Sequence, residues 1–181
     1  MNSGTLRSRL RSATAPLHDQ LDASMSADLS NPQAYGRFLR VQLAARAPVE
    51  AWLAGHASPD LVPPPMASLL VDDLSSLGLP FSLASAPFAL PDSADPLGAA
   101  WALAGSHLGN RAMLAQLGDD ARSMPTAFLS DLTMAHFWRG LLPRLAEKAS
   151  TAVAGPMVDA AERVFAHFLA AERADRQRLA A

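Results

Sequence analysis

Two prolines that directly follow helix-capping side chains constrain this chain toward a helical fold. Asn31 precedes Pro32 and Asp95 precedes Pro96, and each pair is typical of an N-cap residue followed by proline at the first helical position. β-Branched residues, which favour strands, are sparse beside alanine, leucine and arginine. The sequence therefore predicts an all-α protein. We expect helices over residues 5–27, 32–54, 66–77, 96–117, 126–148 and 155–178.

Other prolines mark where these helices bend or stop. Residues 78–95, GLPFSLASAPFALPDSAD, are expected to form a proline-broken loop that still carries apolar side chains. Pro16, Pro48 and Pro143 fall inside helical patterns, where proline kinks or interrupts a helix because it lacks an N–H and clashes with the preceding turn. The 181 residues, half of them apolar, predict one domain over 1–181, a compact bundle of kinked helices. Its ends, 1–4 and 179–181, are expected to be disordered.

Composition removes several classes of function. The chain has no cysteine, which excludes disulfides, thiolate ligands and cysteine nucleophiles. A formal charge of −2 gives no bulk attraction to nucleic acid or to a membrane surface. No N-terminal apolar run and no long apolar stretch occurs, so we expect neither a signal peptide nor a membrane span, and a cytoplasmic location. The E-x-x-H motif and the phosphate-binding glycine motifs are also absent, which argues against a di-iron bundle and against nucleotide binding.

The segment WALAGSHLGNRAM, residues 101–113, places Gly105 and Gly109 inside a predicted helix. Each glycine costs a helix interior about 0.5–1 kcal/mol relative to alanine. A turn of about 100° per residue puts further small residues within about 60° of Gly105; these are Gly98, Ala102, Gly109 and Ala112. Such a bare face permits either close packing of another helix or the approach of a planar ligand, and the pattern alone leaves both open.

His18 lies in the first predicted helix, within LRSATAPLHDQLD, with Leu17 and Leu21 beside it. A neutral imidazole on one helix that faces a bare glycine surface on another would suit a haem held between the two helices. His18 would then supply the axial nitrogen to the haem iron. The alternative is an ordinary core or surface histidine.

Several segments, in order along nearly the whole chain, resemble bacterial haem oxygenases of the biliverdin-producing kind. LRSATAPLHDQLD resembles the proximal segment L-R-x-A-T-x-x-x-H-x-x-L-[ED] of that family, and AGSHLGNR resembles its distal motif G-S-x-L-G-G. YGRFLRVQLAARAPVE and LLVDDLSSLGL resemble two intervening segments, and FWRGLLPRL and AAERVFAHFL resemble the last two helices. The resemblance implies an all-α, single-domain haem oxygenase-like fold.

The same resemblance implies a function and its cofactor. Haem would be both substrate and cofactor, and its oxidative cleavage would give biliverdin, iron and carbon monoxide. Because no nucleotide-binding motif is present, electrons are expected from an external donor, a ferredoxin or a flavin reductase. His18 would be the proximal iron ligand, and Asp22, four residues later, would orient its ring or remain a solvated carboxylate.

On the distal side, Gly105 and Gly109 are implied to face the porphyrin, where they leave bound dioxygen no room to stand upright. Their backbone groups and an ordered water would relay a proton. Ser106 is a second candidate for this relay, unless its hydroxyl bonds back to a helix carbonyl. These three residues form the expected catalytic set.

Four positions depart from the family pattern. Asn110 replaces the last glycine of the distal motif, Ala104 stands where glutamate is common, and Leu43 stands where tyrosine is common. His107 occupies a position where small polar residues are usual. These departures keep a second interpretation open, a non-enzymatic haem-binding or signalling protein with the same fold.

His107 itself is expected to point away from the haem. It lies about 200° from Gly105 and about 160° from Gly109 on a regular helix, so its ring should face solvent or a neighbouring helix. A bend of the helix would swing it inward.

Arg11 is the expected anchor for a haem propionate. It lies seven residues before His18 and, on a continuous helix, shares its face about 10 Å away; a helix that starts at Pro16 would break this register. The other cations considered are Arg139, Lys148 and Arg176, each of which could equally be a solvated surface charge. No metal site is expected from the remaining histidines, of which His56 ends a helix while His136 and His167 lie in apolar stripes of the core or its boundary.

Overall fold

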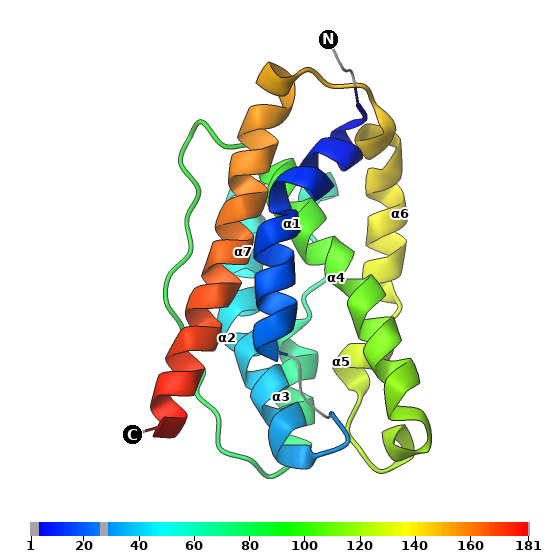
Figure 1. The fold of residues 1–181 in the computed structure, drawn as a ribbon, viewed down its shortest axis with the longest axis vertical. Helices are drawn as coiled ribbons and strands as arrows, with labels where there is room; N and C mark the ends of the chain where they lie inside the picture. Colours follow the sequence, from blue (N-terminus) through cyan, green and yellow to red (C-terminus); the bar gives the residue numbers. More distant parts are fainter. Residues whose placement is uncertain (1–3, 26–28, 181) are drawn as a thin grey trace.

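The computed structural model describes residues 4–25 and 29–180, and these are almost entirely helical (Figure 1). The elements are α1 (Leu6–Met25), α2 (Pro32–His56), η1 (Pro59–Leu61), α3 (Ala67–Ser76), α4 (Pro96–Leu117), η2 (Gly118–Arg122), α5 (Ala127–Ser130), α6 (Thr133–Ala146) and α7 (Thr151–Ala180). Within these described ranges the only β-type pairing is an isolated bridge between Thr5 and Lys148. The all-α prediction is confirmed.

The two predicted N-caps begin helices as expected. The Asn31 side chain accepts hydrogen bonds from the backbone N–H groups of Gln33 and Ala34, and Asp95 Oδ1 accepts one from Leu97 N–H at 2.8 Å. Each carboxamide or carboxylate oxygen satisfies N–H groups that the first helical turn leaves without partners. As a result α2 begins at Pro32, and α4 spans Pro96–Leu117, the bounds expected from the sequence.

The single helix predicted over 126–148 is wrong, because the chain forms two helices there. Asp131 Oδ2 accepts from Thr133 N–H at 2.9 Å and from Met134 N–H at 3.2 Å, so this side chain caps the start of a new helix, α6. The short α5 is capped from elsewhere in the chain, since the Asp73 carboxylate of α3 accepts from Ala127 N–H and Phe128 N–H. Burial raises the pKa of Asp73, and these two N–H bonds oppose that rise.

The last helix begins at Thr151, earlier than the predicted residue 155. Ser150 Oγ accepts from Val153 N–H at 3.3 Å, so this serine caps the first turn of the helix. Of the ends expected to be disordered, Gly4 accepts a hydrogen bond from Ala149 N–H through its carbonyl, and α7 continues to Ala180. Residues 1–3 and 181 lie outside the described residues.

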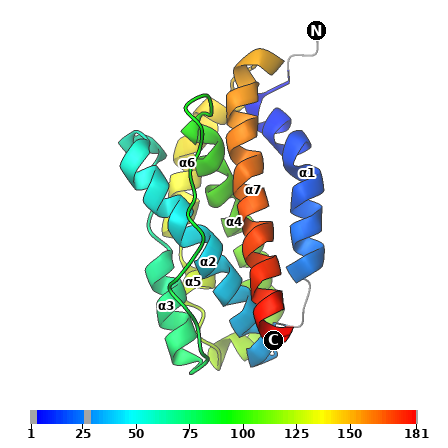
Figure 2. The ribbon, with the colours of Figure 1, turned by 90° about the vertical axis from the view of Figure 1, so that its left-hand side faces the viewer.

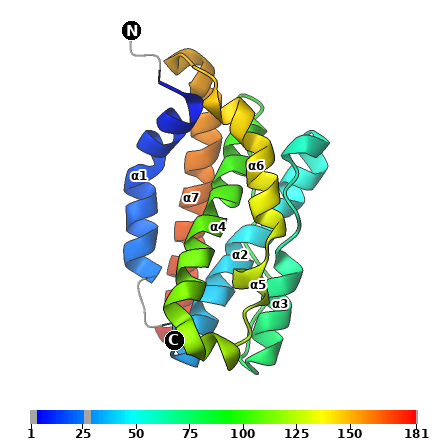
Figure 3. The ribbon, with the colours of Figure 1, turned by 90° about the vertical axis from the view of Figure 1, so that its right-hand side faces the viewer.

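The three prolines expected to kink or interrupt helices interrupt none of them. Pro16, Pro48 and Pro143 lie inside α1, α2 and α6, each of which continues through its proline. Bending is visible in α1 (Figures 1 and 3), which is the accommodation that proline inside a helix requires.

The long helix α7 is the centre of the bundle, and α1, α2 and α4 all pack on it (Figure 2). On the other side α3 packs on α2, and α5 and α6 pack on α4. The buried core between them is largely leucine with a few aromatic rings, among them Tyr35, Phe38 and Phe128. The predicted loop over residues 78–95 is confirmed as a stretch without helix. No helix in the described part of the chain is long and apolar enough to span a membrane.

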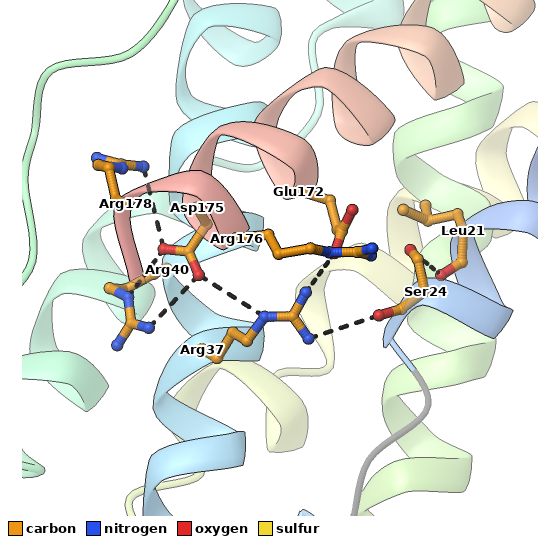
Figure 4. A network of polar contacts seen from close by, with 8 residues as sticks. All are labelled: Leu21, Ser24, Arg37, Arg40, Glu172, Asp175, Arg176 and Arg178. Atoms are coloured by element: carbon orange, nitrogen blue, oxygen red, sulfur yellow. Dashed lines mark hydrogen bonds and ion pairs between the residues drawn. The ribbon is translucent and has the colours of Figure 1, made fainter. Parts of the chain in front are cut away.

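A network of ion pairs ties α2 to α7 near the C-terminal end of α7 (Figure 4). Arg37 bonds to Glu172 and also contacts Asp175, while Arg40 Nε bonds to Asp175 Oδ1 at 3.1 Å. Both carboxylates are buried. Because buried charges are costly unless paired, this network fixes the alignment of the two helices. Arg37 also reaches the Ser24 carbonyl at 3.5 Å and so links α1 to it.

Candidate functional site

The glycine face of α4 has two different environments along its length. At Gly98 an added Cβ would overlap the Met157 carbonyl of α7, so this glycine permits two backbones to approach closely. At Gly105 the nearest atom to such a Cβ is Cζ3 of Trp138 at 3.8 Å, an ordinary contact, and at Gly109 no described atom lies within 4 Å. Helix packing therefore accounts for Gly98, whereas the face at Gly105 and Gly109 is open.

Trp138 of α6 borders one side of this open face. The Arg7 guanidinium of α1 lies 5.5 Å from the Trp138 ring, and the His107 ring lies 5.8 Å from it. His107 is buried, and its Nδ1 is 2.6 Å from the Ala104 carbonyl oxygen. His107 therefore contacts a neighbouring helix, α6, which is one of the two surroundings that the helical wheel predicted. That its ring points away from haem stays a prediction.

Ser106 lies on the other side of the face, next to α2. Its Oγ donates to the Leu103 carbonyl at 2.7 Å and accepts from Arg46 Nη2 at 2.6 Å. The bond back to the helix that the sequence left open as an alternative is thus present. The role of Ser106 as a proton relay stays a prediction.

Arg46, which the sequence analysis missed, is the charged residue closest to this serine. It is only 1% exposed, and its guanidinium lies over the Phe128 ring at 5.4 Å. Glu50, one turn later on α2, places Oε1 at 3.7 Å from Arg46 Nη1 and accepts from Met66 N–H at the start of α3. Burial lowers the pKa of Arg46 and raises that of Glu50, and their mutual attraction opposes both changes. The sequence feature that could have indicated this buried pair is an arginine and a glutamate four residues apart in an otherwise apolar stretch.

His18 lies on α1 with its side chain 55% exposed. Its Nδ1 is 3.1 Å from Asp22 Oδ2, and the Asp22 side chain is itself 66% exposed, so the carboxylate both contacts the ring and is open to solvent. The His18 ring centroid is 5.8 Å from that of Phe165 on α7. An N–H at Nδ1 directed to a carboxylate leaves Nε2 as the nitrogen for a metal ligand. Phe165 is a second residue that sequence reasoning missed.

Both helices that carry the predicted site residues lie against α7. Figure 3 shows α7 between α1 and α4, and each of these two helices packs on α7 as its main partner. Near the N-terminal end of α1, Trp138 of α6 lies between the two helices. Its ring is next to Arg7 of α1 and would be in contact with a Cβ at Gly105 of α4.

The predicted anchoring cations differ in their surroundings. Arg11 is exposed on α1, and since that helix is continuous through Pro16, Arg11 and His18 keep the register in which they share a side. Arg139 and Lys148 are exposed. Arg176 bonds to Glu172 at 2.7 Å and so belongs to the network in Figure 4.

The remaining histidines lie apart from this face. His56 ends α2, stacked on Trp52, as expected. His136 is exposed, so its predicted core or boundary position is wrong, whereas His167 is half-buried against Phe88, and burial lowers its pKa. Across residues 4–25 and 29–180, no cluster of three or more histidine, aspartate or glutamate side chains could hold a metal ion.

Comparison with known proteins gives one match, to a solved structure. The fold is similar to that of the haem oxygenase from Neisseria meningitidis, solved with nitric oxide and with carbon monoxide bound, with a TM-score of 0.71. The two chains are 19% identical, and the match covers 94% of this chain and 92% of that one. No family model matches this sequence, and no curated protein sequence matches it. The likeness therefore establishes a haem oxygenase-like fold.

Proposed function

We propose that this protein binds haem between α1 and α4 and, as a haem oxygenase, cleaves it to biliverdin with release of iron and carbon monoxide. The observation that carries the proposal is the open face of α4, where no described side chain fills the space at Gly109 and only Trp138 borders that at Gly105. Glycine inside a helix is costly, and neither of these two is needed to avoid a clash with the protein around it. A flat ligand explains both, and the fold likeness to a haem oxygenase favours haem.

The residues of α1 suit the proximal side of such a ligand. His18 would bind the iron through Nε2, with Asp22 holding Nδ1 at 3.1 Å and so fixing the ring orientation. Phe165 of α7 packs beside the imidazole. Arg11, exposed on the same side of α1, would hold a propionate by a charge-assisted hydrogen bond.

The residues of α4 suit the distal side. When bound, haem supplies an iron that binds dioxygen and a ring that is itself oxidised. Gly105 and Gly109 keep side chains away from the space above the ring, and their backbone together with an ordered water would position a proton there. The hydroxyl of Ser106 would assist once it turns from the Leu103 carbonyl toward this space.

The electrons for the reaction would come from another protein, for which we propose a ferredoxin or a flavin reductase. The chain has no cysteine to hold an iron–sulfur cluster and no dinucleotide-binding motif. A reductase assay with each donor separately, followed by biliverdin absorbance, distinguishes the two.

A second candidate function is haem binding without turnover. It is favoured by the arrangement of Ser106, whose proton is directed to its own helix, and by the replacement of the last glycine of the distal motif by the buried Asn110. In that case the haem complex would persist under reducing conditions in air.

The deciding experiment adds hemin to the purified protein, then ascorbate or a reductase system in air. Loss of the Soret band with growth of biliverdin absorbance supports the oxygenase, and a persistent haem spectrum supports the second candidate. Absence of any Soret shift on adding hemin would contradict both.

His18→Ala should lose the histidine–haem spectrum and regain it with added imidazole. The matched control is His136→Ala, which removes an exposed histidine of α6 and should leave the spectrum unchanged. A His18→Ala spectrum identical to that of the parent would rule His18 out as the ligand.

A further inference from the structure

Three arginines of α2 differ in how their guanidinium groups are satisfied. Arg37 and Arg40 bond to Glu172 and Asp175 of α7 (Figure 4). Arg46 is more deeply buried than either, yet its Nε and Nη1 have no hydrogen-bond partner in the part of the chain that the structure describes. Nη1 lies 3.7 Å from Glu50 Oε1, too far for a hydrogen bond. Since buried donors are almost always hydrogen-bonded, these two atoms leave room for a further hydrogen-bond partner.

A second unsatisfied group lies one helical turn away. Gln42 Oε1 is buried without a hydrogen-bond partner among the described residues, and residues four apart lie on the same side of a helix. An acceptor at Gln42 and donors at Arg46 can both be satisfied by a bound water, which gives a hydrogen to one and accepts from the other. We call these two buried polar groups of α2 the polar wall, because a water bound between them would satisfy both.

This wall adjoins the open face of α4 through Ser106. Arg46 Nη2 donates to Ser106 Oγ at 2.6 Å. Ser106 lies about 100° around the helix from Gly105 and about 60° from Gly109. The positive charge is therefore placed at the α2 edge of the glycine face.

The charge at this edge has an ion-pair partner but no hydrogen-bonded carboxylate. That partner is Glu50, whose Oε1 lies 3.7 Å from Nη1. The Glu50 carboxylate accepts hydrogen bonds from Met66 N–H and Ala67 N–H at the start of α3. Arginine keeps its proton in proteins. Because the surroundings are buried and of low dielectric, a full charge there acts more strongly on a nearby ligand than it would in water.

We propose that Arg46 makes the glycine face of α4 selective for anionic over neutral ligands of the haem iron, acting through Ser106 and through water held between Arg46 and Gln42. The inference rests on the proposed haem site. Arg46 is a positioning residue, because it acts through the serine and the water and does not itself border the glycines.

The experiment compares an anion with a neutral ligand on the haem-loaded protein. Fluoride is titrated against the ferric form and carbon monoxide against the ferrous form, each followed by absorbance. Arg46→Met should weaken fluoride binding by about tenfold or more, the loss typical of a charge-assisted hydrogen bond, and change carbon monoxide affinity by less than about threefold. The control Arg40→Met removes an arginine of the same helix that pairs with Asp175, and should change neither affinity.

Removing Arg46 alone leaves Glu50 as an unpaired buried charge, which can prevent folding. The double variant Arg46→Met/Glu50→Gln removes both charges together and should show the same loss of fluoride affinity. Glu50→Gln alone keeps Arg46, and its fluoride affinity should equal or exceed that of the parent.

The inference is overturned if the folded Arg46→Met or double variant binds fluoride within about threefold of the parent, or loses fluoride and carbon monoxide affinity equally. Failure of the parent to bind hemin overturns the proposed function instead. Normal hemin binding with unchanged fluoride affinity in the variants overturns this inference alone.

Discussion

Gly98 and Gly109 lie on the same side of the same helix, yet only one of them is explained by the protein around it. The backbone of α7 occupies the space next to Gly98, where Met157 would overlap any added Cβ. The space next to Gly109 holds no described atom within 4 Å. The difference teaches that glycines on one face of a helix can serve different purposes. In α4 the face makes a packing contact toward its N-terminal end and forms an open surface toward its middle.

The largest effect on stability is expected from Gly98→Ala. The new methyl group would meet a main-chain carbonyl of α7, which cannot turn aside as a side chain can. Overpacking of this kind costs about 1–3 kcal/mol, occasionally more, and urea unfolding measures the loss. Gly140→Ala is the control, since no described atom lies within 4 Å of a Cβ there, and it should be neutral or stabilising. Equal stability of the Gly98→Ala variant and the parent would contradict the interpretation that Gly98 serves close packing of α4 on α7.

Gly109→Leu should leave the fold intact but obstruct the open surface. Its side chain would enter the space that we assign to the distal side of haem. We expect hemin still to bind, while the rate of haem degradation falls by about tenfold or more, equivalent to a barrier about 1.4 kcal/mol higher. Single-turnover decay of the Soret band measures the rate, and urea unfolding of the haem-free protein checks stability. Turnover at the parent rate would show that Gly109 does not face the reacting ring.

Gly105→Ala is expected to have the smallest effect and the opposite sign on stability. Its Cβ would lie 3.8 Å from Trp138 Cζ3, an ordinary contact. Alanine is favoured over glycine in a helix interior by about 0.5–1 kcal/mol, so the free energy of unfolding of the haem-free protein should rise by about that amount. A loss of stability here would mean that Gly105, like Gly98, serves helix packing.

Asp22 and His18 illustrate how much of the candidate site could be predicted from sequence. The two are four residues apart on one helix, so local geometry alone brings Nδ1 and the carboxylate together. Arg46 and Ser106 are 60 residues apart and meet only because α2 and α4 pack. No local pattern contains that contact, which is why the buried arginine was missed.

The sequence by itself determined the all-α class, the starts of α2 and α4 and the loop over residues 78–95. Each depends on groups within a few residues of one another, such as the Asn31 side chain and the N–H groups that it caps. Only the tertiary structure decided that α5 and α6 are separate, that His136 is exposed, and that Gly98 is filled while Gly109 is open. These outcomes depend on partners distant in the chain, as when Asp73 caps α5 from 54 residues away, and a backbone approach between two helices exists only once both have packed.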